Sequence, residues 1–175
     1  EAFAKAGYPD CEALLIVEVE GGADEIAWQL GQITKIARRH NPVELREAQD
    51  ADEAGRIWLG RKSAFGAMGQ INDYMCLDGT IPVSSLPFVL RRIGEMSKQF
   101  GLDVANVFHA GDGNMHPLIL FDANKPGDLE TCEAFGAEIL KLCVEAGGCL
   151  TGEHGVGVEK RDLMLHQYDL VDLEA

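Results

Sequence analysis

Short apolar segments alternate with longer amphipathic segments along the chain. In the short type, β-branched and aliphatic residues predominate over a few positions, as in ALLIVEV at 13–19. This type predicts strands at 13–19, 43–48, 74–77, 104–109, 115–121 and 149–151. In the long type, apolar residues recur at every third or fourth position, which is typical of a helix with one buried face. This type predicts helices at 23–39, 51–65, 86–100, 128–146 and 159–166.

Several residues mark where these helices begin and end. Asp50 can accept a hydrogen bond from the first turn of the helix at 51–65. Pro87 suits the first turn of the next helix, and Gly101 is a typical C-terminal stop. Gly147 and Gly148 end the helix at 128–146.

The order of strands and helices is compatible with two fold classes. One is a doubly wound parallel sheet, and the other is an α+β fold with an antiparallel sheet. The connection between 104–109 and 115–121 is too short for a parallel crossover, so this pair must be antiparallel. The glycine pattern of the dinucleotide-binding fold is also missing. The sequence therefore predicts an α+β, ferredoxin-like fold whose antiparallel sheet is covered by helices.

Two histidines flank the glycine-rich connection in NVFHAGDGNMHPLILF, at 106–121. If Asp112-Gly113 forms a two-residue turn, His109 lies directly opposite His116. Opposed side chains share one face of the sheet, about 5 Å apart at Cβ. Two imidazoles at this separation can bind one metal ion, but two surface histidines beside a turn would look the same in the sequence.

A second stretch of the sequence is dense in chemically active residues, namely TGEHGVGVEK at 151–160. Neighbouring residues on an extended chain point in opposite directions, so Glu153 could bind a metal while His154 faces another group. The alternative is a glycine-rich loop that begins a helix, with Glu153 near its positive end. Arg61 could hold a carboxylate in a bidentate fork, or it could be a solvent-exposed arginine.

Composition narrows the possible functions. The chain has 175 residues, of which 46% are hydrophobic, so it can bury a core. A net charge of −14 argues against a nucleic-acid partner. The five cysteines include no C-x-x-C pair and indicate reduced thiols of a cytoplasmic protein. The apolar runs are far shorter than the ~20 residues of a membrane span. A start at Glu1 and an end within a helix-like stretch lead us to expect a piece of a longer protein.

Three stretches together, HAGDGNMHPLILFD, GEHGVGVEK and YMCLDGTIP, resemble one protein family. The chain is similar over nearly its whole length to the C-terminal, substrate-side domain of the FAD-linked oxidases. These enzymes share the vanillyl-alcohol-oxidase type of flavin fold and oxidise 2-hydroxy acids. Within the family, the chain is most similar to the large, flavin-bearing subunits of bacterial glycolate oxidases. D-lactate and D-2-hydroxyglutarate dehydrogenases are more distant relatives.

The resemblance implies a role for each residue of the motifs. His109, His116 and Glu153 match the family's ligands of a divalent metal, which would be Zn, Mn or Fe. His154 matches the general base, which takes the proton of the substrate hydroxyl.

The resemblance also concerns the substrate. Arg61 and Asn114 match positions that hold the carboxylate or hydroxyl of the substrate. Relatives that act on larger dicarboxylic hydroxy acids carry a lysine near the position of Cys76. Its absence favours a small monocarboxylate such as glycolate or D-lactate.

For the whole chain, the resemblance implies that residues 1–175 form the substrate (cap) domain of a flavoenzyme whose flavin-binding domain lies outside this sequence. FAD would be bound mainly by that domain, so we expect the isolated piece to be inactive. The family's partners are a second flavin subunit and an iron–sulfur subunit, which would place the enzyme in the cytoplasm or peripherally at the inner membrane. Two alternatives remain: a metal-dependent hydrolase with a His/His/Glu site, and a ferredoxin-like binding module without chemistry.

Overall fold

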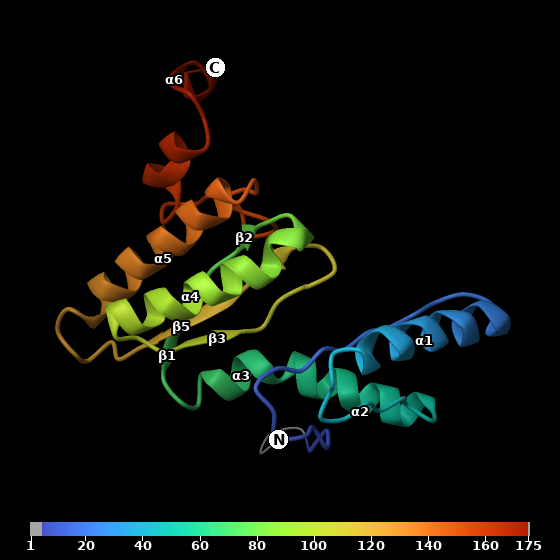
Figure 1. Ribbon diagram of the computed structural model, residues 1–175. Coiled ribbons are helices and arrows are strands. Elements are labelled where there is room, and N and C mark those ends of the chain that lie inside the picture. The colour runs from blue at the N-terminus through green and yellow to red at the C-terminus, as the bar shows by residue number, and fades with distance from the viewer. Residues whose placement is uncertain (1–4, 175) are drawn as a thin grey trace. The chain divides into compact units, whose positions relative to one another are not determined.

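The computed structural model describes residues 5–174, and the chain divides into two compact units, 1–63 and 64–175 (Figure 1). The first unit holds the helices α1 (Ala23–Arg38) and α2 (Ala51–Lys62). The second unit contains every strand of the described chain and its main hydrophobic core. The two units are described separately below.

Helix α2 of the first unit begins at the predicted cap. The Asp50 carboxylate accepts a hydrogen bond from the Glu53 amide at 2.7 Å, and the Glu53 carboxylate accepts one from the Gln49 amide at 2.9 Å. The first bond satisfies an amide that the helix itself leaves unpaired, and the second fixes the residue before the cap. The helix ends at Lys62, somewhat earlier than the sequence indicated.

The strands expected at 13–19 and 43–48 are wrong, because neither segment pairs with another in the structure. Leu15 and Val43 in these segments are exposed. A β-branched sequence favours a strand only where a neighbouring strand and a buried face are available. The first unit offers neither to these segments.

The second unit combines two small antiparallel sheets with two long helices (Figure 1). The strands are β1 (Asp73–Cys76), β2 (Gly79–Thr80), β3 (Val104–Asn106), β4 (Asn114–Met115) and β5 (Pro117–Phe121). The order β1-β5-β3 forms the larger sheet, and β2 pairs with β4 in the smaller. The α+β class is therefore confirmed, while these strand orders do not show the expected ferredoxin-like topology.

Helices α4 (Leu86–Phe100) and α5 (Asp128–Glu145) cover one face of the larger sheet (Figure 1). Their apolar residues form the core together with the inner face of the sheet. Phe135 of α5, which is fully buried, stacks on Phe100 of α4 with ring centroids 5.0 Å apart. Both helices agree closely with the prediction, because apolar periodicity and end signals coincide there.

The remaining elements of the second unit are short. They are α3 (Ala64–Met68), η1 (Val83–Ser85), η2 (Arg161–His166) and α6 (Leu170–Leu173). The helix expected at 159–166 is the 3₁₀ helix η2, and the strand expected at 149–151 is a single bridge between Cys149 and Thr80.

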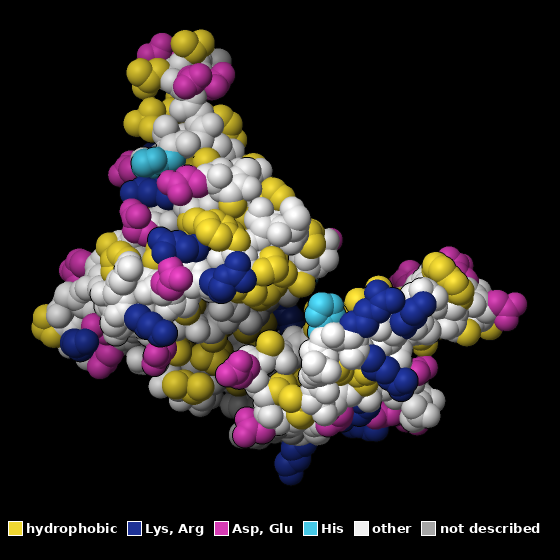
Figure 2. Space-filling model, viewed as in Figure 1, with side chains coloured by type: hydrophobic (Ala, Val, Ile, Leu, Met, Phe, Trp, Pro, Cys, Tyr) yellow, Lys and Arg dark blue, Asp and Glu magenta, His cyan; other side chains and the backbone are white. Residues whose placement is uncertain are grey.

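The surface carries both signs of charge despite the large negative net charge. Figure 2 shows basic and acidic side chains interspersed with hydrophobic ones over the face that carries α4 and α5. The five cysteines are free, and burial raises the pKa of Cys143 to about 12, so this thiol is inert at neutral pH. Among residues 5–174, no helix has both the length and the apolar character needed to cross a membrane.

Candidate metal and substrate site

The two histidines of the glycine-rich connection are held in a register that differs from the expected one. The His109 amide donates to the Asn114 carbonyl at 3.0 Å, so His109 lies opposite Asn114 and not opposite His116. Residues 110–113 form a four-residue loop, in which the His109 carbonyl accepts hydrogen bonds from the Asp112 and Gly113 amides. The expected two-residue turn at Asp112-Gly113 is therefore wrong.

Gly113 explains this longer loop. Its φ is +74°, and a Cβ at this position would lie 2.0 Å from the Ile81 carbonyl oxygen. The Ile81 amide also donates to the Gly113 carbonyl at 2.9 Å, so the loop is attached to the segment after β2. These long-range contacts determine the turn, and the Asp-Gly dipeptide alone could not reveal them.

The two imidazoles nevertheless lie close together. A register shift of two residues keeps every side chain on its original face of a sheet, and diagonal neighbours remain within reach of large side chains. The ring centroids of His109 and His116 are 5.6 Å apart, at an interplanar angle of 81°. The prediction that both rings share one face is thus confirmed, although they are not directly opposite each other.

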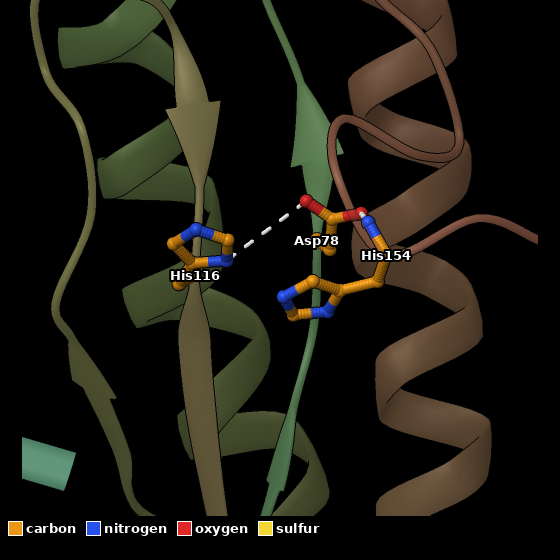
Figure 3. Close-up of side chains that lie close together, drawn as sticks. All are labelled: Asp78, His116 and His154. Carbon is orange, nitrogen blue, oxygen red and sulfur yellow. Dashed lines mark hydrogen bonds and ion pairs between the residues drawn. The ribbon is translucent and has the colours of Figure 1, made fainter.

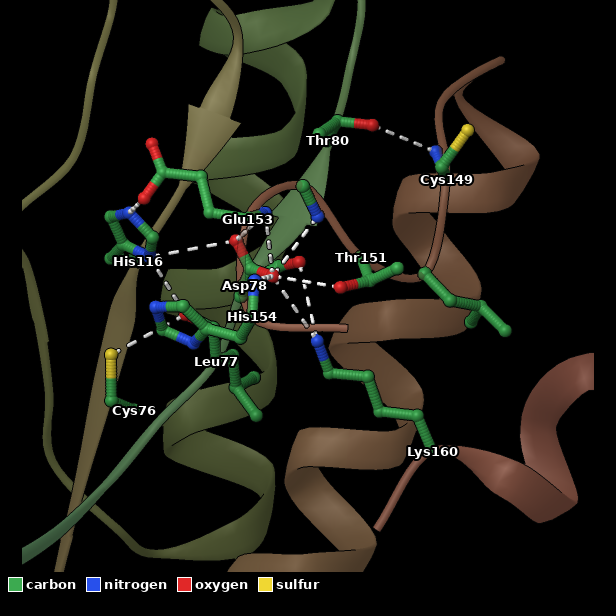
Figure 4. A network of polar contacts seen from close by, with 12 residues as sticks. Cys76, Leu77, Asp78, Thr80, His116, Cys149, Thr151, Glu153, His154 and Lys160 are labelled. Atoms are coloured by element: carbon green, nitrogen blue, oxygen red, sulfur yellow. Dashed lines mark hydrogen bonds and ion pairs between the residues drawn. The ribbon is translucent and has the colours of Figure 1, made fainter. Parts of the chain in front are cut away.

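His116 is buried, and its environment defines which ring nitrogen carries the proton. Its Nδ1 lies 3.1 Å from the Leu77 carbonyl oxygen. Because a carbonyl oxygen only accepts hydrogen bonds, Nδ1 must be the donor, which leaves the lone pair on Nε2. Nε2 lies 3.9 Å from the Glu153 carboxylate, and Figure 4 shows that carboxylate directed towards the ring.

Glu153 belongs to a loop that closes around a buried carboxylate. Asp78 is fully buried and accepts hydrogen bonds from the Gly152, Glu153 and His154 amides at 2.8 to 3.1 Å (Figure 4). The Thr151 hydroxyl also donates to it, at 2.8 Å. Burial alone would raise the pKa of Asp78, but these hydrogen bonds hold it well below its usual range.

A buried lysine completes the surroundings of Asp78. Lys160 Nζ lies 3.4 Å from a carboxylate oxygen of Asp78, and both side chains are almost inaccessible to solvent. A buried charge is costly unless it is paired and hydrogen-bonded, and here each charge has the other as its partner.

Within residues 5–174, two overlapping sets of residues bring potential metal ligands within 4.8 Å of one another. One set is His109, His116 and Glu153, as expected from the sequence, and the other is Asp78, His116 and His154 (Figure 3). The first set suits a metal better, because it uses the free Nε2 of His116.

The second set is weaker in two respects. Asp78 faces Nδ1 of His116, at 4.0 Å, and this nitrogen donates to Leu77. The Asp78 oxygens are also already occupied by amides, a hydroxyl and Lys160. The first set, formed by His109, His116 and Glu153, therefore remains the better candidate, and its two imidazoles and one carboxylate are ligands that Zn, Mn or Fe accepts.

His154 lies beside this set. Its ring stacks on that of His116 with centroids 5.2 Å apart and an interplanar angle of 16°. The side chain is exposed, in contrast to His116. Adjacent residues Glu153 and His154 thus both lie against the His116 ring, whereas the sequence led us to expect that they face different groups.

Asn114 has an unusual environment. The side chain is buried, and its Oδ1 atom has no hydrogen-bond partner among the described residues. Gly152 packs against the amide so closely that a Cβ there would lie 2.6 Å from Oδ1. A buried acceptor without a donor is costly, and its presence suits a position that receives a ligand or water.

Arg61 belongs to α2 of the first unit, so the geometry of the second unit does not test its expected role. Sequence reasoning missed the buried contacts of Asp78 and Lys160. In the sequence, Asp78-Gly79 reads as an ordinary turn, and no spacing rule connects it with amides more than seventy residues away.

The whole chain is similar to known proteins. Residues 1–175 match the family model described as FAD linked oxidases, C-terminal domain. The glycolate oxidase subunit GlcD of Escherichia coli K12 is 50% identical over 171 residues, which cover 97% of this chain and 34% of that protein. The subunit of the same name from Bacillus subtilis is 32% identical over 162 residues, covering 91% of this chain and 34% of that protein.

A more distant relative is the mitochondrial D-lactate dehydrogenase [cytochrome] of Kluyveromyces lactis. It is 29% identical over 161 residues, which cover 87% of this chain and 27% of that protein. The chain thus spans about a third of the length of the curated relatives that it matches.

Proposed function

Since the chain belongs to the family of C-terminal domains of FAD-linked oxidases, we propose that it forms the substrate- and metal-binding part of a 2-hydroxy acid oxidoreductase. The complete enzyme oxidises glycolate or D-lactate to the 2-oxo acid. The relatives named above as glycolate oxidase subunits and D-lactate dehydrogenase support this substrate class. FAD, held mainly by a domain outside this sequence, supplies the acceptor for the hydride when it is bound.

The observation that carries the proposal is the convergence of His109, His116 and Glu153. Their donor atoms fit a divalent cation, and the hydrogen bond from His116 Nδ1 to Leu77 fixes the ring in a metal-binding orientation. A cation bound there would lower the pKa of the substrate hydroxyl and orient it. The ligands His109 and Glu153 are exposed, so a substrate can reach the site from solvent.

The other residues act on the substrate itself. His154 accepts the hydroxyl proton at a ring nitrogen, because imidazole is the side chain that most often serves as a general base and the ring stacks beside His116. The amide of Asn114, with its unpaired Oδ1, receives a hydrogen bond from the substrate. Arg61 holds the substrate carboxylate in a bidentate fork.

Cys76 supports a small substrate with one carboxylate. The thiol is partly buried, and burial together with the nearby Asp78 raises its pKa, so it remains neutral at physiological pH. A neutral group at this position gives no ion pair to a second carboxylate.

We further propose that the enzyme works in a complex. The most similar of the relatives named above is described as a subunit, which supports assembly with a second flavin subunit and an iron–sulfur subunit. Such a complex would lie in the cytoplasm, or peripherally at the inner membrane through its partners.

The decisive experiment uses the full-length protein with its flavin. Glycolate, D-lactate and D-2-hydroxyglutarate are each mixed anaerobically with the enzyme, and loss of the oxidised flavin absorbance is followed. We expect rapid reduction by glycolate or D-lactate and slow reduction by the dicarboxylate. Treatment with a chelator should lower the rate, and added Zn²⁺ or Mn²⁺ should restore it.

The same three ligands could activate water in a hydrolase. Hydrolysis of ester or amide substrates without flavin reduction would favour that function and contradict the oxidoreductase.

A further inference from the structure

The loop that carries Glu153 and His154 donates hydrogen bonds from its backbone amides to one distant residue, Asp78. Three successive amides, those of Gly152, Glu153 and His154, donate to the carboxylate of Asp78. The Gly152 amide also lies 2.9 Å from the Asp78 carbonyl oxygen. Successive amides that converge in this way form an anion-binding concavity, and here the protein supplies the anion itself.

The neighbouring residue orients the other half of the proposed metal site. The Leu77 carbonyl accepts the hydrogen bond from His116 Nδ1. The Leu77 amide in turn donates to the Pro117 carbonyl at 3.0 Å, which attaches the dipeptide to the start of β5. Residues 77 and 78 therefore contact both segments that provide ligands, one at 109–116 and the other at 153.

We propose that Asp78 is a positioning residue, which keeps the loop of Glu153 and His154 in the conformation that binds the metal. The inference rests on the proposed metal site formed by His109, His116 and Glu153. Asp78 does not bind the metal itself in this arrangement. Lys160 Nζ lies 3.4 Å from the Asp78 carboxylate and completes the set of donors around it.

The expected effect on metal binding follows from the loop's conformational freedom. If the loop is not held, Glu153 is in place for only a fraction of the time, and the apparent dissociation constant increases by the inverse of that fraction. Residues that orient metal ligands typically change affinity by about 10- to 100-fold. We expect an effect in this range for Asp78→Asn, because its amide group cannot accept from all the donors that surround the carboxylate.

The chain offers a matched control in Asp128. This residue is also a buried aspartate, and it accepts hydrogen bonds from the Asp122 amide at 3.0 Å and from Lys125 at 2.6 Å. Asp128 begins α5. Cys143 lies fifteen residues further along this helix, and its thiol packs against Gly79, the residue that follows Asp78. At 1.5 Å per residue the two positions are about 22 Å apart along the axis. Asp128→Asn should therefore affect stability without reaching the metal site.

The test compares the full-length wild type with Asp78→Asn and Asp128→Asn. Each metal-free protein is titrated with Mn²⁺, the free ion is measured by electron paramagnetic resonance, and the unfolding temperature is recorded in parallel. We expect a dissociation constant about 10- to 100-fold higher for Asp78→Asn and an unchanged one for Asp128→Asn. If Asp78→Asn does not fold, Thr151→Val removes a single donor to Asp78, and we expect a rise of up to about 10-fold.

Other outcomes would overturn the inference in distinguishable ways. If the wild type and Asp78→Asn bind Mn²⁺ with equal affinity, Asp78 has only a structural role. The same conclusion follows if both aspartate variants lose affinity equally. Retained binding in Glu153→Gln combined with none in Asp78→Asn would make Asp78 a ligand. In these cases the wild type still binds Mn²⁺, whereas a wild type that binds neither Mn²⁺ nor Zn²⁺ would refute the proposed metal site as well.

Discussion

Replacing Gly152 by alanine should disrupt the site through a steric conflict with Asn114. A Cβ at position 152 would lie 2.6 Å from Oδ1, 2.8 Å from Cγ and 3.0 Å from Nδ2 of that side chain. Well-packed carbon atoms are about 3.5–4.0 Å apart, so one of the two segments would have to move by about 1 Å. The Asn114 side chain has little room to move, because it is buried and its backbone is fixed by pairing with Thr80 and with His109.

The cost can be estimated from the behaviour of overpacked interiors. Inserting a methyl group into a tightly packed region typically destabilises a protein by about 1–3 kcal/mol, and we expect Gly152→Ala to fall in this range. Gly94 in α4 provides the control, since a Cβ there meets no atom within 4 Å apart from its neighbouring residues and the backbone of its own helix. Alanine in a helix interior is favoured over glycine by about 1 kcal/mol, so Gly94→Ala should stabilise the chain.

The measurement is urea unfolding followed by circular dichroism. Both tryptophans, Trp28 and Trp58, lie in the first unit, so their fluorescence would not report directly on the second unit. A double-mutant cycle adds Asn114→Ala to Gly152→Ala, and relief of the conflict should appear as a coupling energy of about 0.5–3 kcal/mol. Unfolding curves of Gly152→Ala that coincide with those of the wild type would refute the described packing of Gly152 on Asn114.

Further predictions concern individual groups of the site. In the full-length enzyme, His154→Gln should slow flavin reduction by about 10²–10⁴-fold with unchanged metal content; wild-type rates in stopped flow would show that another residue takes the proton. Arg61→Lys should raise KM for the hydroxy acid, because an ammonium group cannot form the bidentate fork, and an unchanged KM would contradict this role. The lowered pKa of Asp78 should stabilise the fold above the unfolded value of about 3.9, and this contribution should be lost as the pH falls further. Acid unfolding of Asp78→Asn should lack this part of the pH dependence, and equal slopes for the two proteins would argue against it.

Local signals made the long helices predictable. In α4, apolar residues at helical spacing, Pro87 in the first turn and Gly101 after the last turn all indicate the same boundaries. Gly101 adopts a φ of +69°, which costs glycine little and other residues more. The strands expected in the first unit had only their composition in their favour, and composition does not provide a partner strand.

The hairpin of the two histidines shows where local rules fail. Asp112-Gly113 favours a two-residue turn, but the contact of Gly113 with Ile81 and the pairing of His109 with Asn114 select a longer loop. The face of each histidine could still be predicted, because the alternation of a strand is unaffected by a shift of two residues. Sequence thus indicated which side chains meet, while tertiary contacts determined their register.

The groups that surround the proposed ligands lie beyond the reach of any local pattern. The proton on His116 is placed by a carbonyl of Leu77, which any residue at that position would provide, so the side chain carries no signal. Asp78 does have a distinctive side chain, but its partners at 151–154 come from the far end of the chain and are mostly backbone amides, which are the same for almost every sequence. Sequence motifs therefore reveal ligands and bases by their residue types. The residues that hold these ligands in place can be recognised only in the folded structure. A mutation of Asp78 would therefore best distinguish the binding of the metal from the positioning of its ligands.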